Sequence, residues 1–310
     1  MSMSGTIKET PGGSVRSSSQ LLKSLVDDFM SLTKARLSIL VVFTTAFGYL
    51  VATRGAGNFS WMIFFHTVFG TVLAAFGAAV FNQLMEVDAD AKMTRTADRP
   101  LPSNRMPRGL AFVAGWLFSA FGIIHLMLMT EPLAGAVAAA TLAVYLFVYT
   151  PMKRYSSWNT IVGAVSGALP PLIGWAAGGG PMLSVGALFL FALLFFWQLP
   201  HFAAINWMYR EEYEKGGFKM WSNGDSTGSK TARIAVFFSV CVVAVGLVFG
   251  FFDIMAGWFS VAGGLLGLGM LWLALRFLKT TERKDARTLF FYTLLYLPAA
   301  MLVSYLAWRS

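Results

Sequence analysis

Long apolar segments separated by short polar stretches form the dominant pattern along this chain. Each apolar segment has roughly the 17 to 25 residues that a helix needs to cross about 30 Å of hydrocarbon. Alternation with period two is absent, and lipid does not tolerate unpaired backbone, so the pattern predicts helices and no strands. We predict nine transmembrane helices, at about 37 to 53, 60 to 83, 108 to 129, 132 to 149, 157 to 178, 182 to 208, 232 to 252, 255 to 278 and 288 to 308.

The fifth of these segments carries signals of an interruption. Pro170 and Pro171 lie inside it, and a proline in a helix removes a backbone hydrogen bond and favours a kink. The run AGGG at 177 to 180 predicts a tight turn before the sixth helix.

Composition agrees with an all-α, polytopic membrane protein. Of the 310 residues, 56% are hydrophobic and only 13% are charged, whereas about a quarter are charged in a soluble domain. The single cysteine, Cys241, excludes an internal disulfide and a cysteine-based metal site.

The net charge of +9 raises the question of nucleic acid, but the placement of the basic residues answers it. All but Arg54 and Arg309 lie before the first segment, in the loops that follow the second, fourth, sixth and eighth, or at the segment ends next to these loops. The positive-inside rule then places the N-terminus and these loops in the cytoplasm, which accounts for the basic balance without nucleic acid. We expect a mobile cytoplasmic tail at 1–31, since it is polar and rich in serine and glycine, and a transmembrane domain at 32–310.

Carboxylates gather in two of the cytoplasmic loops. Asn82, Glu86 and Asp90 recur every four residues, so they share one helix face if the second helix continues beyond the bilayer. Asp88 points away from that face, and we expect it to pair with Lys92. The second loop holds Glu211, Glu212 and Glu214.

These side chains suit one kind of chemistry. Oxygen ligands without a histidine favour Mg²⁺ bound together with ligand phosphates, and nearby bases can hold a multiply charged anion. The bases are Lys92, Arg95, Arg99, Lys153 and Arg154. Any single base is better explained as a solvated loop residue, but the spaced set of Asn82, Glu86 and Asp90 favours function, because polar groups at membrane depth are costly.

Several motifs, in order, resemble one family. They are LTKARL at 32 to 37, NxxxExDxDAKMxRTxxRPL at 82 to 101, YTPMKRYSSWNTIVGAVSGALPPLIGWAA at 149 to 177, and WQLPHF at 197 to 202 followed by EYEKGG from Glu212. The chain is thereby similar to the UbiA superfamily of membrane prenyltransferases, and within it to the protoheme IX farnesyltransferase (heme O synthase) family.

The resemblance implies a UbiA-type helical bundle that transfers the farnesyl group of farnesyl diphosphate to a vinyl group of protoheme IX. It implies that Asn82, Glu86, Asp90 and Glu212 hold Mg²⁺ and that Lys92, Arg95, Lys153 and Arg154 hold the diphosphate. His201, in WQLPHF, is either a contact to heme iron or a propionate, or a hydrogen-bonded packing residue. His66 and His125 fit no motif and are expected to be packing residues.

The chain departs from the family pattern at four positions. Glu86 and Glu212 stand where aspartate is usual, which changes reach but not charge. Lys219, in GFKM, replaces a usual proline, so the shape of that loop is open. Gly216 stands where relatives acting on aromatic substrates often carry a second carboxylate.

Two alternatives remain open. One is a UbiA-type enzyme acting on a quinone precursor or another aromatic ring. The other is a heme-binding membrane protein or transporter without chemistry, although the carboxylates lie at one surface and no repeated half is visible. We expect a bacterial inner membrane, and a mitochondrial inner membrane is the less favoured alternative, since the N-terminal tail has few acids but is otherwise a weak match to a transit peptide. The resemblance further implies handover of the product to heme A synthase or terminal oxidase assembly.

Overall fold

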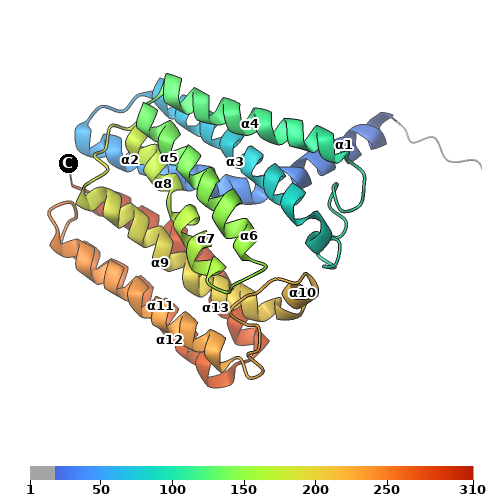
Figure 1. The fold of residues 1–310 in the computed structure, drawn as a ribbon. Helices are drawn as coiled ribbons and strands as arrows, with labels where there is room; N and C mark the ends of the chain where they lie inside the picture. Colours follow the sequence, from blue (N-terminus) through green and yellow to red (C-terminus); the bar gives the residue numbers. More distant parts are fainter. Residues whose placement is uncertain (1–17, 310) are drawn as a thin grey trace, which may run out of the picture.

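The computed structural model describes residues 18–309, which form helices and loops with no strand beyond one isolated bridge between Met255 and Trp308 (Figure 1). In chain order the elements are α1 (Ser18–Leu32), α2 (Ala35–Ala56), α3 (Trp61–Asp90), α4 (Arg108–Met129), α5 (Pro132–Ala143), the π-helix η1 (Val144–Tyr149), α6 (Thr150–Met152), α7 (Asn159–Ala168), α8 (Pro170–Ala177), α9 (Val185–Met208), α10 (Arg210–Lys215), α11 (Ser229–Val248), the 3₁₀ helix η2 (Phe249–Phe251), α12 (Trp258–Thr280) and α13 (Arg283–Ala307).

Nine membrane spans are present within residues 18–309, as the hydrophobic pattern predicts. Seven lie at Ala35–Arg54, Trp61–Asp90, Arg108–Met129, Val185–Met208, Ser229–Phe251, Trp258–Thr280 and Arg283–Ala307. The other two are Pro132–Met152, formed by α5, η1 and α6, and Asn159–Ala177, formed by α7 and α8; Ser229–Phe251 likewise combines two elements, α11 and η2. The break between α7 and α8 falls at Leu169, immediately before Pro170, because proline cannot continue the backbone ladder. The turn at Gly179, with φ of +79°, ends α8 as the glycine run predicts.

The segment before the first span differs from the predicted tail. Residues 1–17 lie outside the described residues, but Ser18–Leu32 form helix α1. The Phe29 ring packs edge-on against Phe76 of α3 and Phe118 of α4, and Asp28 accepts hydrogen bonds from Arg105. Aromatic contacts and a charged anchor therefore hold this segment against the bundle.

Small residues let two spans approach closely. A Cβ on Gly174 of α8 would lie 1.8 Å from the Thr45 backbone oxygen of α2, and one on Gly48 would lie 1.9 Å from the Pro171 oxygen. Packing between spans relies on such close backbone contact because lipid supplies no hydrophobic drive between helices. This contact sets the broken fifth span against α2, along one wall of the cavity described below.

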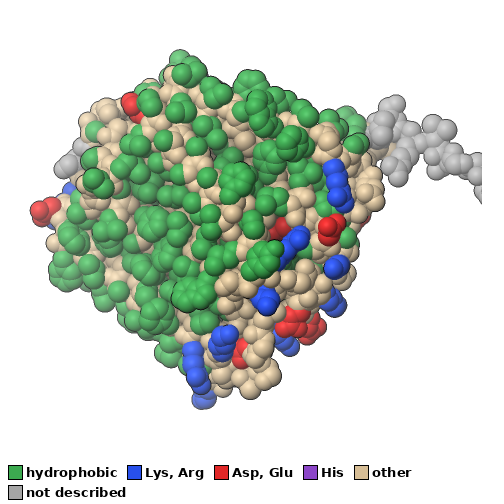
Figure 2. All heavy atoms as spheres, viewed as in Figure 1, with side chains coloured by type: hydrophobic (Ala, Val, Ile, Leu, Met, Phe, Trp, Pro, Cys, Tyr) green, Lys and Arg blue, Asp and Glu red, His purple; other side chains and the backbone are tan. Residues whose placement is uncertain are grey.

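The surface divides into an apolar region and a charged end. Figure 2 shows hydrophobic side chains over the spans, whereas most of the Lys, Arg, Asp and Glu side chains in view gather at the lower right. Figure 1 places α10 and the end of α3 there. The charged loops therefore lie together at one end of the bundle.

Candidate active site

Helix α3 carries the central polar residues. It continues to Asp90, as expected, and Asn82, Glu86 and Asp90 are all buried. Residues four apart lie one above the other on a helix, so these side chains form a polar row at the end of an otherwise apolar span. Burial of two carboxylates requires partners, because an unpaired charge is costly away from water.

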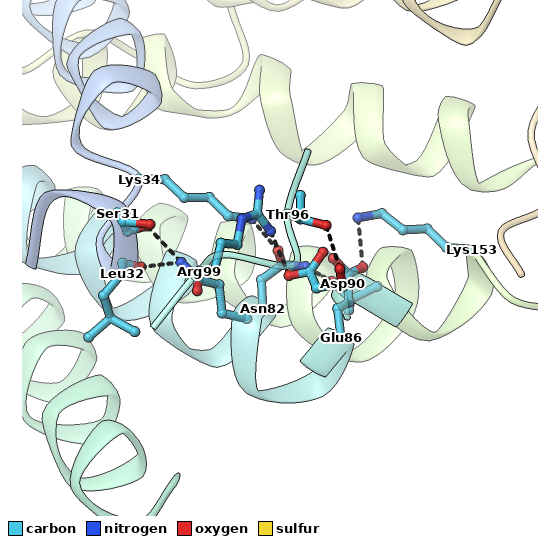
Figure 3. Close-up of polar contacts among 11 residues, drawn as sticks. Ser31, Leu32, Lys34, Asn82, Glu86, Asp90, Thr96, Arg99 and Lys153 are labelled. Carbon is cyan, nitrogen blue, oxygen red and sulfur yellow. Dashed lines mark hydrogen bonds and ion pairs between the residues drawn. The ribbon is translucent and has the colours of Figure 1, made fainter. Parts of the chain in front are cut away.

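Each of these three side chains has a cationic partner from another segment (Figure 3). Lys153 donates to Glu86 Oε1 at 2.8 Å, and Arg99 donates to Asp90 Oδ2 at 2.6 Å. The Lys34 ammonium donates to Asn82 Oδ1. The site is therefore a row of three buried polar side chains, two acids and one amide, each paired with a cation.

Lys34 is the residue that sequence reasoning did not place in the site. It stands between α1 and α2 in the left-handed backbone region, with φ of 46°. Gln83 Nε2 fixes this corner by donating to the backbone oxygens of Ser31, at 2.7 Å, and Leu32, at 2.9 Å. Lys34 is the lysine of the motif LTKARL, so the sequence did single it out, but only the tertiary structure brings residues 34 and 82 together.

Burial and the nearby Arg99 guanidinium lower the pKa of Lys34 to about 7, despite the attraction of Glu86 and Asp90. The pKa of Lys153 shifts in the opposite direction. Burial disfavours its charge, but the Glu86 carboxylate outweighs burial and raises its pKa above the usual value. Lys34 is thus poised to change charge near neutral pH, while Lys153 is a permanent cation.

The loop after α3 closes over the row. Thr96 Oγ1 donates to the Asp90 backbone oxygen at 2.8 Å, and the same loop supplies Arg99. Farther along, Arg105 donates to Asp28 of α1 and to Asp98, with Nη to carboxylate oxygen distances of 2.9 and 2.8 Å. These bonds fold residues 91–107 back onto the protein.

A cavity of about 450 Å³ begins at this cluster and extends between the spans. At the polar end it is lined by Lys34, Glu86, Asp90, Arg95, Arg99 and Lys153. Farther in, the lining is mostly small or apolar, with alanines of α3 and side chains of α2, α5, α8 and α9. Tyr145 and Tyr149 project from η1 into it, and π-helical turns are frequent at functional sites. The cavity therefore fits a ligand with a multiply charged head and an apolar body.

His201 of α9 lines the same cavity. Its Nδ1 lies 2.8 Å from Thr293 Oγ1, and that hydroxyl donates to the Phe290 backbone oxygen at 2.6 Å. Because the hydroxyl proton is already used, the hydroxyl accepts from Nδ1–H, which leaves the lone pair on Nε2. Trp197 and Phe290 stack on the ring at interplanar angles of 22° and 25° and fix its plane.

Of the four remaining predicted site residues, Arg95 lines this cavity, whereas Glu212, Lys92 and Arg154 do not. Glu212, on α10, accepts from the Thr94 backbone N–H at 2.7 Å, and hydrogen bonds from Thr94 lower its pKa against a cost of desolvation. Lys92 is exposed and lines neither this cavity nor the outer one described below. Arg154 also lines neither, and donates to the Met85 oxygen at 3.2 Å. Arg95 lines the cavity with its guanidinium over the Tyr209 and Tyr213 rings.

Asp88 and Lys219 both have partners that the sequence did not predict. Asp88 pairs with Arg108 at 3.7 Å, not with Lys92, because the chain reverses after the loop and brings the start of α4 alongside α3. Lys219, which stands where a proline is usual, is held in its loop by two backbone hydrogen bonds. Its backbone N–H donates to the Lys153 oxygen at 2.7 Å, a bond that proline lacks, and its oxygen accepts from Asn159.

Glu86 and Asp90 supply the carboxylate oxygens that line the cavity. Within residues 18–309 no group of three or more His, Cys, Asp or Glu side chains could hold a metal, so Glu212 does not join Glu86 and Asp90. Mg²⁺ is commonly bound by one or two carboxylates together with substrate phosphates and water. Glu86 and Asp90, on one face and against the cavity, fit that mode. Asn82 instead binds Lys34 and donates to Thr150 Oγ1 at 3.2 Å.

Fold and site together define a polytopic membrane protein whose cavity fits an amphipathic anion. The sequence matches the UbiA prenyltransferase family over residues 41–295, and the chain belongs to that family. It is accordingly a membrane prenyltransferase.

Within this family, the chain is similar to proteins that share one name. A protein named protoheme IX farnesyltransferase from Opitutus terrae is 40% identical over 275 residues, which cover 88% of this chain and 92% of that protein. One with the same name from Solibacter usitatus is also 40% identical, over 87% of this chain and 95% of its own length.

Solved structures show the same fold at low identity. A digeranylgeranylglyceryl phosphate synthase has a TM-score of 0.75 at 15% identity, with 91% of this chain and 98% of that one covered. A UbiA homolog from Archaeoglobus fulgidus bound to GPP and Mg²⁺ has a TM-score of 0.64 at 13% identity, with 89% and 99% covered.

Proposed function

We propose that this protein transfers the farnesyl group of farnesyl diphosphate to a vinyl group of protoheme IX and thereby makes heme O. The names of its relatives support this acceptor. The observation that carries the proposal is that one cavity contains both the Glu86 and Asp90 cluster and the available Nε2 atom of His201. A diphosphate head and an iron-containing ring are the ligands that these two groups suit.

The charged end holds the diphosphate. Arg99 and Lys153 supply permanent positive charges, and Lys34 supplies one that titrates near pH 7. Glu86 and Asp90 would hold Mg²⁺. Bound there, Mg²⁺ supplies charge neutralisation to the diphosphate leaving group. When the allylic carbon–oxygen bond breaks, its electron pair leaves with the diphosphate, and the surrounding ammonium and guanidinium groups stabilise that charge.

The rest of the cavity holds the carbon skeletons. The Tyr145 and Tyr149 rings line it beside Lys153, and their electron-rich faces stabilise positive charge on the allyl group. The vinyl carbon attacks this cation and forms the new carbon–carbon bond. Water then adds to the resulting ring-side cation and releases a proton, giving the hydroxyethylfarnesyl group. The apolar walls limit earlier capture by water.

The cellular setting forms part of the proposal. The distribution of basic residues favours a cytoplasmic position for the site loops. A bacterial inner membrane is our preferred location, with a heme-modifying enzyme or oxidase assembly as the consumer of the product.

An acceptor assay tests the proposal. Membranes containing the protein are incubated with Mg²⁺, farnesyl diphosphate and either protoheme or 4-hydroxybenzoate. We expect a farnesylated product only with protoheme, and none from membranes containing Asp90→Asn. A product only with 4-hydroxybenzoate would assign a quinone-type acceptor, and no diphosphate release with either would favour a non-enzymatic heme-binding protein.

A further inference from the structure

A second, outer cavity lies beside the first at the charged end. It measures about 610 Å³ and is formed by the loop after α3, the end of α9, α10 and the turn between α12 and α13. Its lining residues include Arg95, Trp207, Tyr209, Arg210 and Arg283. Arg95 lines both cavities, so the two spaces meet at this side chain.

The arginines are arranged to bind planar anions. The Arg210 guanidinium lies 4.3 Å from the centre of the Trp207 ring, and that of Arg95 lies 5.0 Å from the centre of the Tyr209 ring. Contact with an aromatic face restricts a guanidinium, and the N–H groups that it does not otherwise use can donate to a carboxylate. One Arg210 nitrogen, Nη1, already donates to the Trp207 backbone oxygen at 3.3 Å. Trp207 is itself fixed, because its Nε1 donates to the Thr281 oxygen at 3.0 Å.

Three arginines and two acids, Glu211 and Glu212, line this cavity, so a net positive charge remains. Glu212 is occupied by Thr94 and by Lys215 at 3.6 Å. Glu211 lies 3.5 Å from Arg210, but its side chain is 76% exposed, and an ion pair this open to solvent contributes little. Arg283 has no ion-pair partner within residues 18–309. Positive charge therefore remains at the mouth of the inner cavity.

We propose that the outer cavity binds the carboxylate groups of the acceptor, through Arg210, Arg283 and the shared Arg95. This inference rests on the proposed function. In protoheme the two propionates lie on the edge of the ring opposite the two vinyl groups. Carboxylates held at the mouth therefore direct the vinyl edge toward the inner cavity, where the allylic diphosphate binds. The acceptor is then oriented by charge before any reaction.

The test compares protoheme with its dimethyl ester, which keeps the iron and both vinyl groups but lacks the two charges. The purified protein is titrated with each compound by absorbance, and kcat/KM is measured for each with farnesyl diphosphate. Arg210→Gln and Arg283→Gln are the test variants. Lys284→Gln is the matched control, since Lys284 is exposed next to Arg283 but does not line the cavity.

We expect the natural protein to favour protoheme over the ester by about tenfold or more, the size of one or two charged hydrogen bonds. Each arginine variant should reduce that ratio toward one, whereas Lys284→Gln should keep it and no variant should change the KM for farnesyl diphosphate. Equal use of acid and ester by the natural protein would overturn the inference, as would an arginine effect on both acceptors alike. Binding of protoheme without turnover would count against the proposed function, while the binding ratio would still decide the role of the cavity.

Discussion

Lys153 donates a hydrogen bond to Glu86 at 2.8 Å, although the two residues are 67 positions apart and their side chains are only 11% and 6% exposed. This ion pair joins the end of the second span to the loop after the fourth. Glu86 therefore has two roles, since it neutralises a buried lysine and faces the cavity in which we place the diphosphate.

Glu86→Gln is expected to lower stability as well as activity. It leaves the Lys153 ammonium buried without its counter-charge, a change that costs about 3–5 kcal/mol in comparable pairs. Thermal unfolding in detergent measures the loss, and adding Lys153→Met should restore most of the stability but not the turnover. Asp88→Asn, on the exposed side of the same helix, serves as the control with little effect. Equal destabilisation by Glu86→Gln and by Asp88→Asn would refute a stabilising role for the Lys153–Glu86 ion pair.

Asp90→Asn separates chemistry from folding. The amide keeps the shape of the side chain but cannot offer a charged oxygen to Mg²⁺ or to Arg99. We expect turnover to fall by about 10²–10³, as when one electrostatic contact to a transition state is removed. The amount of protein in the membrane should stay normal, because the Arg99 side chain is 22% exposed and its charge can be hydrated, unlike that of Lys153. Chelation of Mg²⁺ should abolish the activity of the natural protein, and added Mg²⁺ should restore it. Near-normal activity of Asp90→Asn would remove Asp90 from the site.

Binding of the diphosphate should depend on the charge of Lys34. Burial and the neighbouring Arg99 lower the pKa of Lys34 to about 7, so the free protein loses this positive charge as the pH rises through 7. A bound anion favours the protonated form, so binding takes up a proton above pH 7, and affinity should weaken by up to about tenfold per pH unit there. Calorimetry in buffers of different ionisation enthalpy measures the proton uptake. Lys34→Arg should abolish the uptake, because arginine stays protonated, and an unchanged uptake would assign it to another group.

The orientation of His201 should control heme binding. Thr293→Val removes the acceptor that holds the proton on Nδ1, and loss of such an orienting bond typically reduces ligand affinity by 10–100-fold. His201→Ala should alter the absorption spectrum of the bound heme. His66→Ala is a suitable control, because His66 bonds His125 at 3.1 Å and, of the three histidines, only His201 lines the cavity. An identical heme spectrum in His201→Ala would exclude contact with iron.

Membrane orientation can be measured with single cysteines in a Cys241→Ser background. Ser226→Cys lies in an exposed loop between the sixth and seventh spans, and Asn58→Cys lies in the loop between the first two. The positive-inside rule predicts that a membrane-impermeant thiol reagent reaches position 58, and not 226, from outside the cell. The reverse labelling would invert the topology.

The amino-acid sequence by itself determined the helical class, the number of spans and the break at Pro170. These features depend on local properties, namely the length of apolar runs and the missing N–H of proline. It also placed Asn82, Glu86 and Asp90 on one face, because helical spacing is local as well. It did not predict helix α1, whose stability depends on contacts of Phe29 and Asp28 with distant segments.

Only the tertiary structure decided which partners these side chains meet. Lys34 and Lys153 reach α3 from segments 48 and 67 residues away, Glu212 turns to Thr94, and Lys92 stays in solvent. A sequence identifies which loops carry charge, but burial and backbone direction select the few charges that enter the cavity. Those selections involve residues far apart along the chain, so no local pattern specifies them.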